Sequence, residues 1–269
     1  MASISEMFSL KDRVALVTGG AGILGEQHCE TLAELGAKVI MLDKDEIKGS
    51  ESAEKISMQT GSSVTFKKVN LQEKDSIESI FNETFKDYGR IDILVNNAAA
   101  KSENFFEPFE SFPLEDWREV MSVNLDAMFL CAQQAGRYMK ANQKGSIINF
   151  VSIYGIVAPD QSIYEGSEYM GRSINTPAIY SASKGGVFML TRYLASYWGK
   201  IGIRTNSITP GGIFSGQNDT FVKNYSRRCP LGRMGKRDEI KGAIAYLASD
   251  ASSYVNGHNL VVDGGWSIW

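Results

Sequence analysis

The side chains best suited to acid–base chemistry are a tyrosine and a lysine four positions apart. Tyr180 and Lys184 occur in the run Tyr-Ser-Ala-Ser-Lys, and this spacing places both on one face of a helix. A tyrosine hydroxyl has a pKa of about 10 in water, and a nearby ammonium group lowers that pKa. The pair therefore predicts a general acid–base site. Because such a run is common by chance, the alternative is an ordinary solvent-facing pair.

A glycine-rich segment near the start of the chain is the second pattern that could do chemistry. Gly20, Gly22 and Gly25 read as G-x-G-x-x-G between an apolar run at 14–17 and a helical pattern, and Asp43 ends the next apolar run. Such a turn lets N–H groups at a helix start approach a pyrophosphate, and the acid can accept hydrogen bonds from ribose hydroxyls. This context predicts dinucleotide binding rather than a plain glycine turn.

Asp43 also bears on the choice of cofactor. Its carboxylate would repel a 2′-phosphate, so NAD(H) is the expected cofactor. Lys44 is the next residue, and a neighbouring cation can tolerate a phosphate. NADP(H) therefore stays open as the alternative.

Apolar runs that predict strands alternate with amphipathic patterns that predict helices along the whole chain. Polar or glycine-rich residues follow the strands, and parallel strands bring such tips to one edge of a sheet. Residues 1–269 are therefore expected to form one α/β domain, a doubly wound Rossmann sheet of about seven parallel strands with helices on both faces. The expected strands are 14–17, 39–42, 64–69, 91–95, 146–151, 204–208 and 260–262. The first expected helix follows the glycine turn and ends at 35, and the others cover 44–60, 75–88, 113–142, 178–198 and 237–249.

Composition argues against several classes of protein. The 269 residues are 43% hydrophobic with a net charge of −3, so neither nucleic acid nor an anionic membrane surface is an expected partner. The three cysteines form no CxxC pair and only two histidines occur, so neither a disulfide framework nor a metal site is expected. Residues 1–10 lack the features of a signal peptide and no apolar run has the length of a membrane span, so the expected location is the cytoplasm.

Taken together, these motifs resemble the classical short-chain dehydrogenase/reductase family over nearly the whole chain. The similarity is carried by Thr18-Gly19 with the glycine turn, Asn96-Asn97-Ala98, Asn124 in a Val-Asn-Leu run, Ser152, Tyr180 with Lys184, Pro210-Gly211, and the segments 230–233 and 262–265. Each motif is weak alone, but their order is specific. The resemblance implies an NAD(P)(H)-dependent oxidoreductase that interconverts a secondary alcohol and a ketone.

The resemblance assigns catalytic roles to four residues. It implies that Tyr180 is the general acid–base at the reacting oxygen and that Ser152 hydrogen-bonds the same oxygen. Lys184 would bind the nicotinamide ribose and tune Tyr180, and Asn124 would hold a water that links Lys184 to solvent. For Asn124, the alternative is a capping or helix-kinking amide.

The resemblance also implies a set of cofactor contacts. Asn70 and Leu71 would flank the adenine, and the backbone of 210–213 with the Ser215 hydroxyl would hold the carboxamide. Ile23 stands where the family usually has its second glycine, which gives a glycine spacing typical of members that act on nucleotide sugars. The full set expected to bind the cofactor is Gly19, Gly22, Ile23, Leu24, Gly25, Asp43, Asn70, Leu71, Asn97, Ala98, Tyr180, Lys184, Pro210, Gly211, Ile213 and Ser215.

The largest departure from the family pattern is the long segment between Ser152 and Tyr180. The surplus falls at about 158–176, and because both ends lie beside the reacting carbon, this insertion is expected to form one wall of the substrate pocket. Its polar composition favours a polar, sugar-like substrate. The alternative is a solvated loop without a role. The expected substrate contacts are Ser152, Tyr164, Glu165, Arg172 and Tyr180.

Three other functions remain open. A 3-oxoacyl thioester reductase for acyl-carrier-protein substrates would favour NADPH and a basic surface, which Asp43 and the negative net charge argue against. A nucleotide-sugar dehydratase or epimerase fits the glycine spacing, but little chain follows Pro210 to form a nucleotide-sugar domain. A cofactor-sensing binding protein would not need the four catalytic residues.

A homotetramer or homodimer is also expected. The helices over 113–142 and 178–198 carry more apolar residues than one buried face uses, including Phe129, Met189 and Tyr193. Family members pair these helices across two-fold axes, which makes the contact isologous. The alternative is that the sheet buries all of these side chains.

Overall fold

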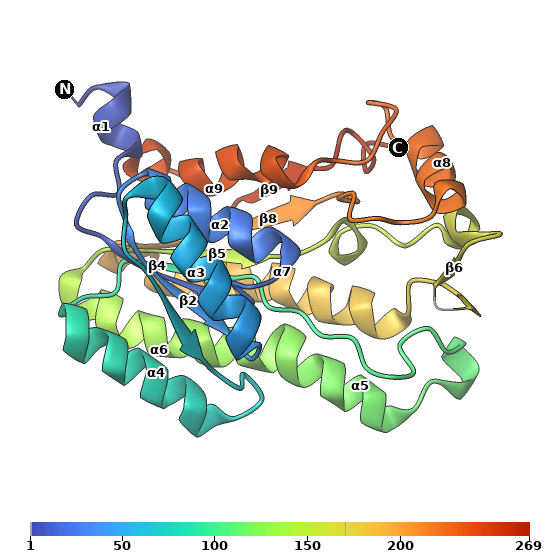
Figure 1. Cartoon of the computed structure of the whole chain (residues 1–269), viewed down its shortest axis with the longest axis horizontal. Helices are drawn as coiled ribbons and strands as arrows, with labels where there is room; N and C mark the ends of the chain where they lie inside the picture. The colour runs from blue at the N-terminus through green and yellow to red at the C-terminus, as the bar shows by residue number, and fades with distance from the viewer. Residues whose placement is uncertain (1, 170) are drawn as a thin grey trace.

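Seven parallel strands form the sheet around which the protein folds. In this computed structural model, which describes residues 2–169 and 171–269, the strand order is β3-β2-β1-β4-β5-β8-β9 (Figure 1). The order reverses at β1, where the chain crosses from β3 to β4, and ligands bind at such a switch point beyond the carboxyl ends of strands. The strands are β1 (Val14–Thr18), β2 (Lys38–Asp43), β3 (Val64–Lys68), β4 (Ile93–Asn96), β5 (Gly145–Phe150), β8 (Ile203–Pro210) and β9 (Asn259–Val262).

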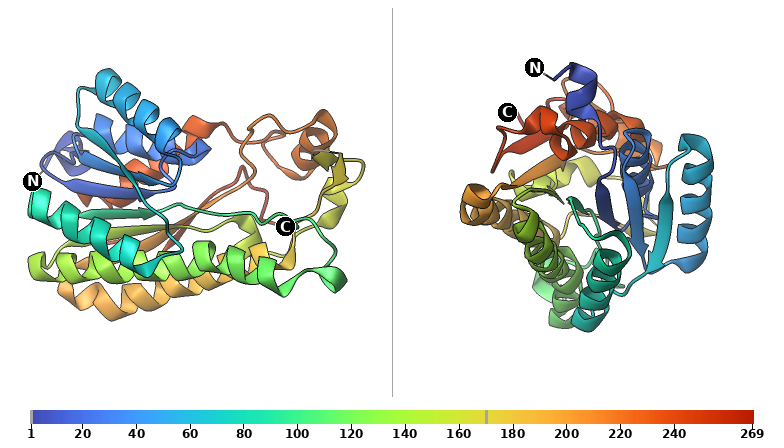
Figure 2. Two further views of the ribbon diagram at one scale, coloured as in Figure 1. Left: turned by 60° about the horizontal axis from the view of Figure 1, so that its bottom comes forward. Right: turned by 90° about the vertical axis from the view of Figure 1, so that its left-hand side faces the viewer.

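Helices cover both faces of the sheet because its strands are apolar on both sides (Figure 2). Along β1, Ala15 and Val17 pack against one set of helices, and Val14 and Leu16 pack against the other. The arrangement confirms the predicted doubly wound sheet. The first face is covered by α2 (Ile23–Glu34), α3 (Glu46–Thr60) and α9 (Lys241–Ala248), and the second by α4 (Lys74–Tyr88), α6 (Ala127–Asn142) and α7 (Ala178–Trp198).

The helix predicted over 113–142 is present but interrupted. A turn of π-helix at Ser122–Asp126, which contains Asn124, separates α5 (Leu114–Met121) from α6. Two further helices, α1 (Ile4–Phe8) and α8 (Asp219–Arg228), are short and were not among the helices that the sequence predicted. No helix of the described residues is long and apolar enough to cross a membrane.

The insertion at 158–176 consists of short local elements. A 3₁₀ turn covers Gln161–Tyr164, and β6 (Glu168–Tyr169) pairs with β7 (Arg172–Ser173) as a small antiparallel hairpin. The hairpin and α8 both extend beyond the carboxyl edge of the sheet, at the right of Figure 1 and of the left view in Figure 2. The insertion therefore lies at the same edge as the polar strand tips.

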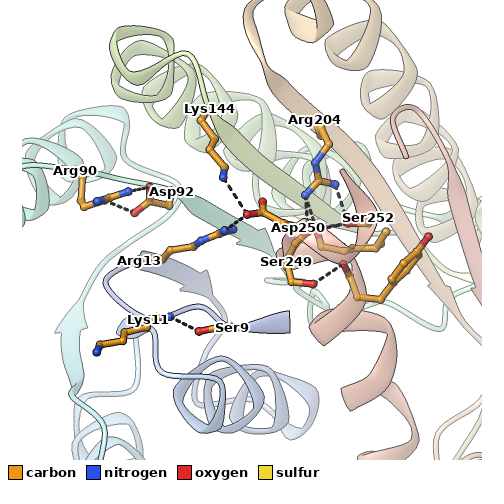
Figure 3. A network of polar contacts seen from close by, with 12 residues as sticks. Ser9, Lys11, Arg13, Arg90, Asp92, Lys144, Arg204, Ser249, Asp250 and Ser252 are labelled. Carbon is orange, nitrogen blue, oxygen red and sulfur yellow. Dashed lines mark hydrogen bonds and ion pairs between the residues drawn. The ribbon is translucent and has the colours of Figure 1, made fainter. Parts of the chain in front are cut away.

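Paired charges close the opposite, amino edge of the sheet (Figure 3). Asp250, just after α9, accepts hydrogen bonds from Arg13 at 2.5 Å and from Lys144 at 3.0 Å. Arg204 of β8 donates to the carbonyl oxygens of Leu247 and Ser249, both at 3.1 Å, where α9 ends. These contacts join the starts of β1, β5 and β8 to the end of α9.

Candidate active site

Two glycines, one just after β1 and one in the first turn of α2, occupy positions where any side chain would collide with the backbone. Gly19 has a left-handed φ of 62°, and a Cβ there would lie 2.8 Å from the Cα of Ala98. A Cβ on Gly25 would lie 2.0 Å from the carbonyl oxygen of Gly19. Gly22 is the N-cap of α2, so the N–H groups of the next residues have no acceptors within the helix. The turn therefore fits a pyrophosphate, as dinucleotide binding requires.

A buried hydrogen-bond network supports this turn from below. The Asn97 side chain donates to the carbonyl oxygens of Thr18 at 3.1 Å and Gly19 at 3.0 Å, and the Thr18 hydroxyl accepts from the Ala98 N–H. The side-chain oxygen of Asn97 lies 3.2 Å from Nε2 of His28, a fully buried residue of α2. Because that oxygen can only accept, Nε2 carries the proton, and burial lowers the pKa of His28 to about 3. His28 is thus a neutral support of the turn.

His28 is one of the two histidines that the sequence interpretation counted only in arguing against a metal site. The signal that could have revealed its role is its place one helical turn after the last glycine of the motif. The described residues contain no group of three His, Cys, Asp or Glu side chains that could hold a metal ion.

Asp43 ends β2 beside the glycine turn. Its carboxylate accepts hydrogen bonds from the N–H groups of Ala21 at 3.1 Å, Lys44 at 2.8 Å and Asp45 at 3.2 Å. Asp45 is in turn the N-cap of α3. The backbone therefore fixes one carboxylate beside the turn and places a second nearby, while the Lys44 side chain is exposed.

The residues expected around the adenine follow β3. Asn70 is exposed and its side chain donates to Glu73 at 2.7 Å. Leu71 is half-buried and packs against the core of the second face. Both lie after the carboxyl end of a strand that neighbours β2, which is compatible with the expected contacts.

The residues expected near the carboxamide follow β8. Gly211 donates its N–H to the carbonyl oxygen of Val262 at 3.0 Å, which leaves the Pro210–Gly211 turn fixed against β9. Ile213 packs against the core of the first face, and the exposed Ser215 accepts a hydrogen bond from Gln217 at 3.1 Å.

Ser152, Tyr180 and Lys184 meet beyond the end of β5. Ser152 follows that strand, Tyr180 lies in the first turn of α7, and both side chains line one cleft. Lys184 is only 2% exposed, and its Nζ donates to the carbonyl oxygen of Phe150 at 2.8 Å. The helical spacing and the strand tip together assemble the predicted serine, tyrosine and lysine.

The π turn brings Asn124 to the same place. Its side-chain oxygen accepts from the Ala100 N–H at 2.8 Å, and its side-chain nitrogen donates to the Ser183 hydroxyl at 3.2 Å. Ser183 donates onward to the carbonyl oxygen of Tyr180 at 2.9 Å. Asn124 is fully buried, and through these two contacts its side-chain amide links α7 to the segment after β4.

The electrostatics of Tyr180 differ from the sequence expectation in one respect. Burial raises the pKa of Tyr180 above its usual value, and the contact with Ser152 only partly offsets that rise. Burial also lowers the pKa of Lys184 to about 8, and its ammonium group points at the Phe150 carbonyl oxygen. The lysine therefore does not bring the pKa of Tyr180 below its usual value. The positive charge of an oxidised nicotinamide is the contribution that would lower it.

A cleft of about 740 Å³ opens in front of Ser152 and Tyr180. Its lining comes from the segment after β4, the insertion, and the chain from the end of β8 into α8. Ile23, the first residue of α2, also reaches it, whereas Leu24 packs into the core. The lining residues that the sequence interpretation had not selected include Lys101, Phe105, Phe106, Gln217 and Phe221.

Of the three contacts expected from the insertion, only Tyr164 lines this cleft. Its ring stacks on Phe221 with centroids 5.4 Å apart. The expectation is corrected for Glu165 and Arg172, which are exposed and lie outside the cleft. The 3₁₀ turn buries Ile163 and directs Tyr164 inward, so Glu165 faces a neighbouring groove, and Arg172 lies at the exposed hairpin.

Comparisons with known proteins agree with this geometry. A sequence model of the family described as enoyl-(acyl carrier protein) reductase matches residues 20–267. The chain is 35% identical to 2-dehydro-3-deoxy-D-gluconate 5-dehydrogenase of Bacillus subtilis (strain 168), over 99% of each chain. It is 33% identical to 5-keto-D-gluconate 5-reductase of Escherichia coli (strain K12), over 98% of this chain and 99% of the relative.

Among solved structures, a gluconate 5-dehydrogenase from Burkholderia cenocepacia J2315, in complex with NADP and tartrate, has a TM-score of 0.88 and 33% identity. The match covers 99% of this chain and 100% of that one. Matches of this extent, over a fold and site with this geometry, show that the chain belongs to the short-chain dehydrogenase/reductase family of oxidoreductases.

Proposed function

We propose that the protein interconverts a secondary alcohol and a ketone on a polar, sugar-like substrate, with NAD(H) as the favoured cofactor. The observation that carries the proposal is that Ser152 and Tyr180 line the same cleft, with Lys184 buried one helical turn after Tyr180. A substrate oxygen between the two hydroxyl groups can accept a hydrogen bond from each. The nicotinamide ring, when bound, supplies or accepts the hydride at the reacting carbon.

The protein's own groups handle the proton. In reduction, the Tyr180 hydroxyl donates its proton to the substrate oxygen, and the Ser152 hydroxyl donates a hydrogen bond to the same oxygen as charge develops on it. In oxidation, Tyr180 receives the proton. Lys184, with a pKa near 8, can exchange protons close to neutral pH, and we assign Asn124 the role of holding a water that connects this buried lysine to solvent.

The cleft supports a substrate with several hydroxyl groups. Its lining includes hydrogen-bonding side chains from the insertion and from the loop before α8, and we assign the wall formed by 158–176 to substrate recognition. A site built to hydrogen-bond rejects analogues that lack the partner group. The two relatives named above are called after reactions on gluconate derivatives, which also supports a sugar-like substrate. The polar side chains of the lining are Tyr164, Asn175, Thr176, Gln217 and Asn218.

Asp43 supports NAD(H) as the favoured cofactor. Three backbone N–H groups hold its carboxylate beside the glycine turn, and Asp45 adds a second negative charge there. A 2′-phosphate at this place would face both carboxylates at short range. The Burkholderia structure contains NADP, so the exposed Lys44 is the residue that would favour phosphate if the preference were reversed.

We also propose that the protein forms a homotetramer or homodimer. Four apolar side chains of α6 and α7 are 47% to 67% exposed: Phe129, Met189, Tyr193 and Tyr197. The sheet therefore does not bury them, and a second copy would. Sedimentation is expected to show a dimer or larger species at micromolar concentration, and a monomer would contradict the proposal.

Steady-state kinetics test the proposed function. Rates with NADH and NADPH are measured against 5-keto-D-gluconate, L-sorbose and acetoacetyl thioester, and the highest kcat/KM is expected for NADH with a sugar ketone. An Asp43→Ser variant is expected to reduce the preference for NADH by about 10-fold, since a charge-assisted hydrogen bond is lost. Preference for the thioester with NADPH would instead favour an acyl thioester reductase. NADH binding without turnover would favour a sensor.

A further inference from the structure

Lys101 is held in the cleft by aromatic rings. Its ammonium nitrogen lies 5.7 Å from the ring centroid of Phe105, 5.3 Å from that of Phe106 and 5.7 Å from that of Tyr169. These distances are typical of cation–π contacts. Phe105 also meets the ring of Tyr180 edge-on, with centroids 6.3 Å apart. A single aromatic side chain thus separates the ammonium group from the proposed acid–base.

Lys101 has no acidic partner among the described residues. It makes none of the ion pairs found there, and it is the only lysine or arginine that lines the cleft. Glu168, also on the lining, is exposed and does not pair with it. Lys101 is exposed as a residue, but the rings remove part of the hydration of its ammonium group, which lowers the pKa of Lys101. The cleft therefore presents one cation whose attraction for an anion is not used within the protein.

We propose that Lys101 binds a carboxylate of the substrate, so that the natural substrate is a sugar acid rather than a neutral sugar or polyol. This inference rests on the proposed function, because Ser152 and Tyr180 fix the reacting carbon at one end of the cleft. The carboxylate at the far end of the same molecule then meets the ammonium group. Although Lys101 and Tyr169 are exposed, the rings displace part of the water around the ammonium group, which strengthens a charge-assisted hydrogen bond formed there.

The competing explanation is that Lys101 only packs against the aromatic rings and stabilises the segment after β4. A packing role would affect all substrates alike, whereas recognition of a carboxylate would affect only acids. The comparison therefore needs two substrates that differ in nothing else. 5-Keto-D-gluconate and L-sorbose form such a pair, because L-sorbose carries a CH₂OH group where the acid carries its carboxylate.

The test measures kcat and KM for both substrates in the wild-type enzyme and in Lys101→Met and Lys101→Arg variants. Lys101→Met is expected to lower kcat/KM for 5-keto-D-gluconate by about 10- to 100-fold, mainly through KM, and to leave L-sorbose within about two-fold. Lys101→Arg is expected to retain most of the activity on the acid. Lys140→Met, an exposed lysine of α6, serves as the matched control and should change neither substrate.

Equal losses on both substrates would show a structural role, and no loss would place the carboxylate elsewhere. Either result overturns the inference. If the wild-type enzyme reduces L-sorbose as well as the acid, the inference falls while the proposed function stands. If it reduces neither, the proposed function fails. Calorimetric titration of the NADH complex with D-gluconate and D-glucitol tests the role of Lys101 without turnover. Only the affinity for gluconate should depend on Lys101.

Discussion

The two edges of the sheet use charged side chains in opposite ways. At the amino edge, Asp92 accepts two hydrogen bonds from Arg90 and one from the Val14 N–H, and Asp250 is paired with Arg13 (Figure 3). At the carboxyl edge, the buried ammonium group of Lys184 has only a carbonyl oxygen as its partner. The strands thus begin among satisfied ion pairs and end at a site whose charges are still available.

This difference has a physical consequence. Paired ions hold elements together but have little remaining attraction for a ligand, whereas a cation without an acid is costly to bury and gains from a bound anion. Lys184 is in the second situation because it is buried, and Lys101, which is exposed at the cleft, likewise has no acidic partner among the described residues. We therefore expect substitutions at the carboxyl edge to change activity and substitutions at the amino edge to change stability.

The largest effect is expected from Tyr180→Phe. The variant loses the proposed proton carrier but keeps the ring that Phe105 contacts, so kcat should fall by about 10²- to 10⁴-fold while NADH affinity and melting temperature change little. Steady-state kinetics and fluorescence titration measure the two quantities. Activity within a few-fold of wild type would remove Tyr180 from the mechanism.

A smaller effect, on stability alone, is expected from Asp92→Ala at the amino edge. The change leaves the Val14 N–H without its acceptor at 2.8 Å and Arg90 without its carboxylate, so the free energy of unfolding should fall by about 1.5–3 kcal/mol. Denaturant titration measures the loss, and kcat/KM should be unchanged. Lys144→Ala is the control: its pair with Asp250 is exposed, so the cost should stay below about 1 kcal/mol. Lost activity in folded Asp92→Ala enzyme would contradict the separation of the two edges.

The smallest effect is a pH dependence of stability that comes from His28, which is an exception at the carboxyl edge because it is a buried neutral support of the turn. Its pKa is about 3 in the folded protein and 6.5 in the unfolded chain, so between these values only the unfolded state binds the proton. Stability is therefore lost as pH falls below 6.5, by about 1.4 kcal/mol at pH 5.5. Denaturant titrations at pH 7.5 and 5.5 should show a smaller difference for His28→Gln than for wild type. An identical difference would mean that His28 is not buried neutral.

Features that depend on a few adjacent residues could be predicted from the sequence. The glycine turn follows from backbone sterics at Gly19 and Gly25, and the shared face of Tyr180 and Lys184 follows from the helical period. The alternation of apolar runs with amphipathic patterns likewise determined the layers of the fold, because buried strands must be covered on both faces.

Features that depend on which distant segments meet were decided only by the tertiary structure. No local pattern shows that the segment after β4 brings Lys101 under Tyr169, or that His28 bonds to Asn97. The insertion shows the limit most clearly, because its composition predicted a polar wall but not which side chains turn inward. A 3₁₀ turn and the contact of Tyr164 with Phe221 determine that orientation, and both depend on packing against α8, far away in the sequence.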